Sequence, residues 1–402
     1  MRGGGYTDVL PVLQVPDNKA DAVPCERLQK RSMDMPQLNI DCEGPITQND
    51  NAYELCDALI PEGGNFFARV SKYDDYLADI EKRQGYKAGD TLKLLLPFLM
   101  ACGATNKKMA EFSEKTLILL PGASDMLTKV AGLMPTFIIS TSYCPYLQAL
   151  CKVSGFPEDQ VYCTSLDLDQ YELTEQEQNR LEELASEIAG QPLLSWPEEA
   201  ENIRDLSNEN QALVSRLDTI FWEEIPKMRI GKILSDVNPV GGFEKARAVE
   251  DSLKKTGLTL SEVLYVGDSI TDVQALELIK NAEGVAISFN GNRYSIKAAK
   301  WACMCGNTAI IGAIARLLIL NGMEAMDELM ADMDSDQAEG TGFLDALASM
   351  GVGPAFLEPL RLLRDKDAPR LFLVNSTNIS DVIKDSEYMR KNVRGLSVGE
   401  LG

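Results

Sequence analysis

Histidine is absent from all 402 residues of this sequence. Its absence excludes Ser-His-Asp and Cys-His nucleophilic catalysis and any acid–base step on an imidazole. It also excludes phosphohistidine intermediates and the usual zinc sites, which contain histidine. Any chemistry must therefore use carboxylates, hydroxyls, lysines, cysteines or a bound ion.

Positive charge is scarce as well. The chain has 39 Lys and Arg against 61 Asp and Glu, which gives a net charge of −22. Such a surface repels the phosphate backbone of nucleic acids and the anionic headgroups of lipids. We therefore expect no nucleic-acid partner.

Long hydrophobic runs are missing too. The most apolar stretches, residues 92–102 and 309–320, are too short for a membrane span, and the second carries Arg316. The first 16 residues lack a basic segment followed by an apolar one, so no signal peptide is predicted. We expect a cytoplasmic protein without membrane insertion.

The nine cysteines are odd in number and scattered through apolar stretches. This distribution predicts reduced thiols and not a disulfide framework. Cys303 and Cys305 form one C-x-C pair, which suits buried packing or, alternatively, metal binding. The spacing does not match an iron–sulfur cluster.

Short apolar runs alternate with helical patterns along the chain. Strands are expected near residues 38–40, 135–140, 263–266, 285–289 and 301–304. Helix-type spacing is found for Leu92, Leu95, Leu96 and Leu99, for Leu181, Leu184, Ala185 and Ile188, and from 242 to Gly257. This alternation predicts an α/β protein with a doubly wound parallel sheet.

The sequence divides into five predicted parts. They are an irregular arm (1–36), a Rossmann-like core (37–48, 116–163 and 227–320), a helical cap after the first strand (49–115), an acidic helical insertion (164–226) and a C-terminal extension (321–402). Thirteen acidic residues fall between Asp167 and Glu209 against only Arg180 and Arg204. A run of this kind is typical of a solvated helix face.

Chemically capable residues follow the predicted strands or begin a predicted helix. They are Asp41 with Glu43, Ser140, Lys245, and Asp268 with Asp272. Two aspartates at neighbouring strand ends offer the hard oxygen ligands that Mg²⁺ prefers. A hydroxyl and a lysine suit the remaining oxygens of a phosphoryl group. A carboxylate can then attack phosphorus while a second one acts as acid and base.

Each of these residues alone has an ordinary interpretation. Asp41 could be a turn residue, Ser140 a loop hydroxyl and Lys245 a helix-surface lysine. Asp268 and Asp272 could be a helix N-cap and a first-turn acid. The hypothesis rests on their ordered occurrence in one alternating α/β chain.

Four segments follow one another in this order: Asp41-x-Glu43-Gly44-Pro45, Ile138-Ile139-Ser140, Lys245 and Gly267-Asp268-Ser269-x-x-Asp272. Together they resemble the motifs of the haloacid dehalogenase (HAD) superfamily, in its phosphoserine-phosphatase-like branch. Four longer stretches can be compared as well, namely residues 41–55, 238–245, 265–276 and 288–294. They resemble the HAD-like family described as energy-converting hydrogenase A, subunit R. The resemblance covers roughly residues 37–305.

The resemblance implies a role for each matching residue. Asp41 would be the nucleophile and a Mg²⁺ ligand, and Glu43 the general acid and base, with its backbone carbonyl on the metal. Ser140, with Thr141 as the alternative, and Lys245 would bind the phosphoryl group. Asp268 and Asp272 would complete the metal site. The sequence departs from the superfamily pattern at Glu43, where most members have Asp.

The expected function is that of a Mg²⁺-dependent phosphatase acting on a small phosphomonoester through an aspartyl-phosphate on Asp41. One alternative is a catalytically weak or inactive HAD-like subunit that binds a protein partner through its acidic surfaces. Another is a phosphotransferase that uses the same residues. The sequence does not identify the substrate.

Overall fold

The computed structural model describes residues 35–331 and 340–395. The predicted N-terminal arm, apart from its last two residues, lies outside the described residues. So do parts of the predicted C-terminal extension. From Pro36 onward the chain forms one unit.

Seven strands form a single sheet in the order β3-β2-β1-β4-β5-β6-β7. Their bounds are β1 (Gln37–Ile40), β2 (Thr136–Tyr143), β3 (Val161–Thr164), β4 (Val263–Gly267), β5 (Val285–Phe289), β6 (Trp301–Met304) and β7 (Arg370–Leu373). The first six pair in parallel, and β7 pairs antiparallel with β6. The predicted α/β fold is confirmed, with an antiparallel edge strand that the sequence had not indicated.

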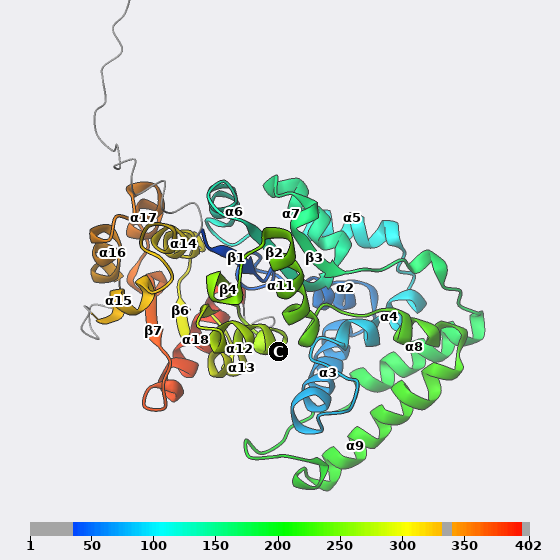
Figure 1. Cartoon of the computed structure of the whole chain (residues 1–402). Coiled ribbons are helices and arrows are strands. Elements are labelled where there is room, and N and C mark those ends of the chain that lie inside the picture. The colour runs from blue at the N-terminus through cyan, green and yellow to red at the C-terminus, as the bar shows by residue number, and fades with distance from the viewer. Residues whose placement is uncertain (1–34, 332–339, 396–402) are drawn as a thin grey trace, which may run out of the picture. The chain divides into compact units, whose positions relative to one another are not determined.

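Helices cover both faces of this sheet (Figure 1). Alternate residues of one strand serve opposite faces, as the pleat requires: Leu264 and Val266 pack in one core, while Val263 and Tyr265 pack in another. The first face is covered by α6 (Ala123–Ala131), α7 (Cys144–Ser154), α14 (Ala309–Asn321), α15 (Ala325–Ala331), α16 (Gly340–Ser349) and α17 (Pro354–Arg361). The second face is covered by α11 (Phe243–Thr256), α12 (Val273–Asn281), α13 (Arg293–Ala298) and α18 (Ile379–Arg394).

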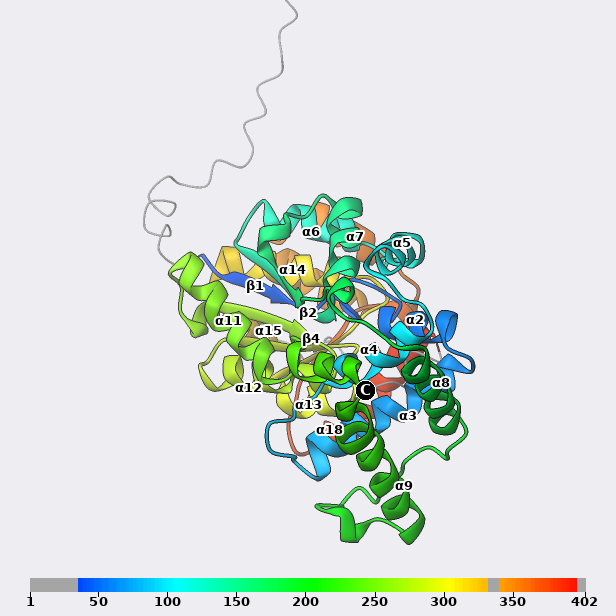
Figure 2. The same cartoon turned by 90° about the vertical axis from the view of Figure 1, so that its right-hand side faces the viewer.

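The remaining helices form a separate layer with its own hydrophobic core (Figures 1 and 2). Their bounds are α2 (Asn51–Leu59), α3 (Gly63–Asp75), α4 (Thr91–Ala101), α5 (Asn106–Thr116), α8 (Glu175–Ala189), α9 (Asn208–Asp218) and α10 (Ile233–Asp236). Most of them come from the two predicted insertions, but α10 lies in a stretch predicted as core, beyond residue 226. Helix α8 packs against α3 and α4. The four apolar residues predicted to share one face of α8 are all buried there.

A disulfide joins Cys144, at the start of α7, to Cys163 in β3, with 5.1 Å between their Cα atoms. The expectation that the thiols remain reduced is wrong for this pair. The reason lies in the sheet, because parallel pairing of β2 and β3 brings Tyr143 opposite Thr164 and so places the two cysteines side by side. Cys303 and Cys305 are buried and free.

Among the described residues, no single helix is long and apolar enough to cross a membrane. Helices α14 and α15 meet that test of length and composition only as a pair, bent by 103°.

Candidate active site

The centre of the sheet brings two aspartates together. Asp41 follows β1 and Asp268 follows β4, and these neighbouring strands pair in parallel with Ile40 opposite Val266. The backbone N–H of Asp41 extends this pairing by donating to the carbonyl of Val266 at 2.9 Å. After β1 the chain adds β2 and β3 on one side of that strand and then β4 on the other side. Such a reversal of strand order leaves a crevice at the carboxyl ends of the strands.

Lys245 connects the two aspartates that flank it. It lies in the first turn of α11, where its Nζ is 2.6 Å from Asp41 Oδ2 and 2.7 Å from Asp272 Oδ1. Its side chain is fully buried. Burial lowers the pKa of Lys245, but the attraction of Asp272 and Asp41 outweighs that effect and raises it above its ordinary value. The lysine therefore carries a fixed positive charge beside Asp41.

Asp272 accepts hydrogen bonds on both carboxylate oxygens. Oδ1 accepts from Lys245 Nζ and from the Tyr265 hydroxyl at 2.8 Å. Oδ2 accepts from the backbone N–H groups of Asp268 at 3.0 Å and Ser269 at 3.1 Å. Burial raises the pKa of Asp272, but Lys245 and these donors outweigh it, so the net shift is downward. The carboxylate thus holds Lys245 and the turn after β4 in place.

Asp41 is buried and faces several charges. Its Oδ1 accepts from the backbone N–H of Cys42 at 2.7 Å, while Oδ2 meets Lys245. Burial and the negative charge of Asp272 raise the pKa of Asp41 well above its usual range, against the opposing effect of Lys245. A further cation would favour the ionised form that a nucleophile needs.

Asp41, Asp268 and Asp272 together suit a metal ion. Each offers a carboxylate oxygen, and these oxygens lie within 4.8 Å of one another. Hard oxygen donors at a buried sheet edge are the donor set that Mg²⁺ prefers. Each oxygen of Asp272 already has at least two donors from the chain, whereas each oxygen of Asp41 has one, so Asp41 and Asp268 are the better placed ligands.

The Glu43 carboxylate turns away from this cluster toward α2. Its Oε1 accepts from the backbone N–H of Asn51 at 2.8 Å. The pKa of Glu43 is raised to about 8, first by burial and then by the carboxylate of Asp50, while the Asn51 N–H opposes both effects. Glu43 is therefore protonated near neutral pH, and it lines the same cavity as Asp41.

Of the two predicted hydroxyls, Thr141 lines the cavity, and Ser140 is not among the lining residues. Ser140 is buried in β2 and its Oγ accepts from the backbone N–H of Ser142 at 3.1 Å. Thr141 donates to the carbonyl of Val240 at 3.0 Å. Both residues are buried, and Thr141, the alternative residue, is the one that lines the cavity.

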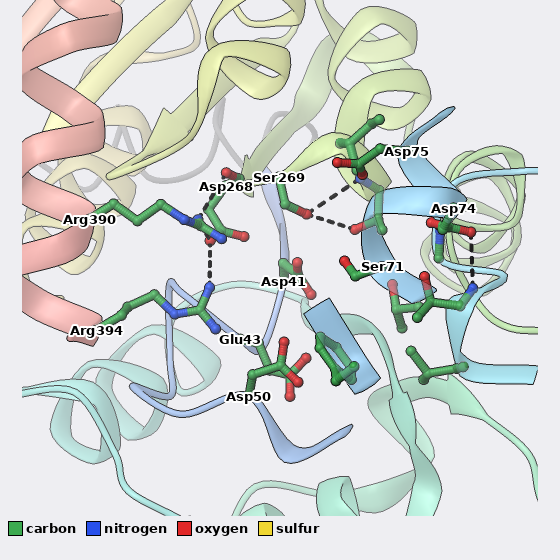
Figure 3. Close-up of a pocket in the computed structure, with 17 residues that line it drawn as sticks. Asp41, Glu43, Asp50, Ser71, Asp74, Asp75, Asp268, Ser269, Arg390 and Arg394 are labelled. Atoms are coloured by element: carbon green, nitrogen blue, oxygen red, sulfur yellow. Dashed lines mark hydrogen bonds and ion pairs between the residues drawn. The ribbon is translucent and has the colours of Figure 1, made fainter. Parts of the chain in front are cut away.

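A cavity of about 90 Å³ lies where the sheet edge meets the helical layer. Its walls come from the strand ends, from α3, from the start of α4 and from α18 (Figure 3). The lining residues are Asp41, Glu43, Asp50, Phe67, Ser71, Asp74, Asp75, Gly89, Thr91, Leu92, Thr141, Asp268, Ser269, Ile270, Thr271, Arg390 and Arg394.

The helical layer is closed against the core at this cavity. A Cβ atom on Gly89 would come within 2.8 Å of Thr141 Cγ2, and one on Gly241 would come within 2.3 Å of the Ala88 carbonyl. Asp74 fixes this loop, since its carboxylate accepts from the backbone N–H groups of Gly89 and Thr91, both at 3.0 Å. The space available to a ligand in this state is correspondingly small.

Most residues that line the cavity were not predicted, among them two arginines that contact Asp268. Arg390 and Arg394, both on α18, approach Asp268 from the side opposite Asp74 and Asp75 (Figure 3). They lie more than 120 residues from Asp268 in sequence. The only signal was their spacing of four on a helical pattern, which is also common on solvent-exposed helix faces.

Comparison with solved structures shows an extensive match. The chain is similar to gene product AF1437 from Archaeoglobus fulgidus, with 26% identity, a TM-score of 0.71, and coverage of 91% of this chain and 99% of that one. The two chains share a fold over nearly their whole length. No model of a known protein family matches the sequence.

Weaker similarities extend to proteins with described activities. A phospho-aspartyl intermediate analogue of phosphoserine phosphatase is 11% identical with a TM-score of 0.38, covering 67% of this chain and 92% of that one. A HAD family hydrolase from Salmonella enterica serovar Typhi is also 11% identical with a TM-score of 0.38, covering 64% and 62%. Similarity this low does not carry an argument about function. The narrower resemblance to a hydrogenase subunit stays a prediction.

Proposed function

We propose that this protein is a Mg²⁺-dependent phosphohydrolase of the HAD type, which hydrolyses a small phosphomonoester through an aspartyl-phosphate on Asp41. The observation that carries the proposal is the buried arrangement of Asp41 between Lys245 and the Asp268 turn, at the open end of the central strands. Asp41, Lys245 and Asp268, which belong to the sequence motifs that resemble the HAD superfamily, support the same assignment.

Asp41 and Asp268 would hold the metal. When bound, Mg²⁺ would offset their charge and draw electron density from the phosphoryl oxygens. Lys245 would neutralise a further phosphoryl oxygen, and the Thr141 or Ser140 hydroxyl would hydrogen-bond another. These groups orient the phosphorus atom toward the Asp41 carboxylate.

In the first step an Asp41 oxygen attacks phosphorus, and the bond to the ester oxygen breaks. Glu43, which holds a proton near neutral pH, gives that proton to the departing alkoxide. In the second step Glu43, now ionised, takes a proton from water as the water attacks the same phosphorus. Inorganic phosphate leaves and Asp41 is restored.

The test is release of inorganic phosphate from a panel of phosphomonoesters, with Mg²⁺ and with EDTA. We expect turnover that requires Mg²⁺ and is lost in Asp41→Asn, which cannot form the acyl phosphate. Glu43→Gln keeps an oxygen for the Asn51 N–H but has no proton to give, so turnover should fall by about 10²–10⁴-fold.

Lys384→Gln serves as the control, because Lys384 is exposed on α18 and its replacement removes a charge outside the site. Turnover that persists in Asp41→Asn would contradict the mechanism. Failure to hydrolyse any ester of the panel in the presence of Mg²⁺ would contradict the proposed function.

A further inference from the structure

Helix α18 inserts two arginines into the candidate active site. Arg390 and Arg394 are four residues apart and so lie on the same face of the helix. They are only 3% and 7% exposed. Nη1 of Arg390 contacts Asp268 Oδ2 and also donates to the Asp268 carbonyl at 3.2 Å. Nη1 of Arg394 donates to the same carboxylate oxygen at 3.2 Å.

The helix is held firmly in this position. Val382 and Met389 pack in a core with Ile296 and Met304 of the α/β unit. The Ser386 hydroxyl donates to the carbonyl of Gly291 at 2.8 Å, a hydrogen bond that is buried. The two guanidinium groups therefore reach Asp268 from a packed helix and not from a surface loop.

The charges of the cluster nearly balance without a ligand. Three carboxylates, on Asp41, Asp268 and Asp272, face three cationic side chains, Lys245, Arg390 and Arg394. The Asp50 carboxylate, which lines the same cavity and attracts both arginines, adds one further negative charge. A divalent cation alone would add two positive charges to this buried site, and a phosphate dianion alone would add two negative ones. Uncompensated buried charge is costly, so each ligand enters more easily with the other.

The two arginines can also pass from the Asp268 carboxylate to a bound phosphate when a metal binds. Both guanidinium groups contact Asp268 Oδ2, so a metal that takes this oxygen competes with them directly, and one that takes Oδ1 still shares the negative charge of the carboxylate with them. Once released, those groups need another anion, because they are buried beside the cavity that Asp41 lines. A guanidinium presents a planar set of donors that matches the oxygens of a phosphate.

We propose that Arg390 and Arg394 form an anion subsite for phosphate that is coupled to the metal. Without ligands they occupy Asp268 and weaken its affinity for a divalent cation. With the metal on Asp268 they bind the phosphate dianion. This inference rests on the proposed function only in assigning phosphate chemistry to the site, since it concerns binding and not turnover.

The experiment is calorimetric titration of the full chain with Mg²⁺, with inorganic phosphate, and with each in the presence of the other. In the wild-type protein each probe should tighten the binding of the other, and the two factors should be equal by linkage. In Arg390→Gln and in Arg394→Gln, Mg²⁺ alone should bind about tenfold more tightly, because Asp268 has lost a competitor. Phosphate in saturating Mg²⁺ should bind about tenfold more weakly.

Lys384→Gln removes a charge from the exposed side of the same helix and should leave both affinities as in the wild type. Arg394→Lys keeps the charge but loses the planar donors, so it should retain weak Mg²⁺ binding while losing part of the phosphate affinity. This variant also serves if a glutamine variant unfolds, which a thermal melt would reveal.

An unchanged or weaker Mg²⁺ affinity in the arginine variants would overturn the inference. So would unchanged phosphate affinity in those variants, or no detectable binding of either probe to the wild type. The two proposals fail separately. Mg²⁺-dependent hydrolysis without the arginine effect contradicts only the coupling, whereas the arginine effect without hydrolysis contradicts only the proposed activity.

Discussion

Gly44 determines how closely the ends of β1 and β4 can approach each other. Its φ of +106° lies where side chains are rarely found, and a Cβ atom there would lie 2.1 Å from Asp268 Oδ2. The residue thus combines a backbone requirement with a steric one. Asp268 can face Asp41 and the arginines only because position 44 has no side chain.

Gly44→Ala should therefore destabilise the protein more than the backbone conformation alone explains. The added methyl group must displace the Asp268 carboxylate, and overpacking of this kind typically costs about 1–3 kcal/mol beyond the strain. The matched control is Gly155→Ala, since Gly155 has a φ of +72° with nothing within 4 Å of its Cβ position. Chemical denaturation of both variants measures the difference, and equal losses would contradict the steric argument.

Single residues also show which parts of the site the sequence can predict and which it cannot. Asp41, Lys245, Asp268 and Asp272 were selected because each follows a strand or begins a helix, and parallel strands place their carboxyl ends on one edge. Their order in the chain was therefore enough to predict that they meet. No such rule links a helix 120 residues further on to that edge, so Arg390 and Arg394 could not be predicted.

At the scale of secondary-structure elements, the predicted cap and the predicted acidic insertion are one structure. They are separated in sequence by α6, β2, α7 and β3, yet they share a single hydrophobic core. The sequence shows that α8 has an apolar face but not which helices pack against it, because an apolar face indicates only that it must be buried. The partners are α3 and α4, whose residues also line the cavity.

Leu184→Ala tests this shared core. Leu184 is fully buried on α8, and removing such a side chain typically costs about 2–5 kcal/mol. Because the layer should loosen as a unit, amide hydrogen exchange should speed up in α3 and α4 as well as in α8. Leu317→Ala, in the separate core beneath α14, should not show this pattern. A rise confined to α8 would contradict the shared unit.

Edge strands were the other elements that sequence reasoning missed. Strand β7 is only four residues long and lies among short helices, so its apolar pattern is too brief to distinguish from a helix. Strand β3 is equally short. The central strands are buried on both faces. Strands β4 and β5 were predicted from near-continuous apolar runs, and β1 from a short apolar stretch followed at once by acidic residues and a Gly-Pro turn.

At the scale of the whole molecule, the excess of acidic residues extends into the interior. Asp74 is almost fully buried, and burial raises its pKa to about 7 despite hydrogen bonds from Tyr86, Gly89 and Thr91. A carboxyl group with a raised pKa binds its proton more tightly in the folded chain than in the unfolded one. Its stabilising effect is complete below about pH 4 and is lost as the pH rises through about 7.

Asp74→Asn should therefore flatten the pH dependence of the free energy of unfolding. Between about pH 4 and 7 the slope should decrease by up to about 1.4 kcal/mol per pH unit, the value for one proton. Urea denaturation in EDTA at several pH values measures it. Asp169→Asn, at an exposed position, controls for loss of a carboxyl group. An identical slope in wild type and Asp74→Asn would contradict the assignment.

The position of α18 in the chain has a consequence for synthesis. Chains fold as they emerge from the ribosome, N-terminal parts first. The strands that carry Asp41 and Asp268 are made long before Arg390 and Arg394, which belong to the last described helix. During that interval the nascent chain carries its acidic cluster without the two arginines. A growing chain would therefore attract divalent cations more strongly than the finished protein does, and α18 would end that period by completing the site.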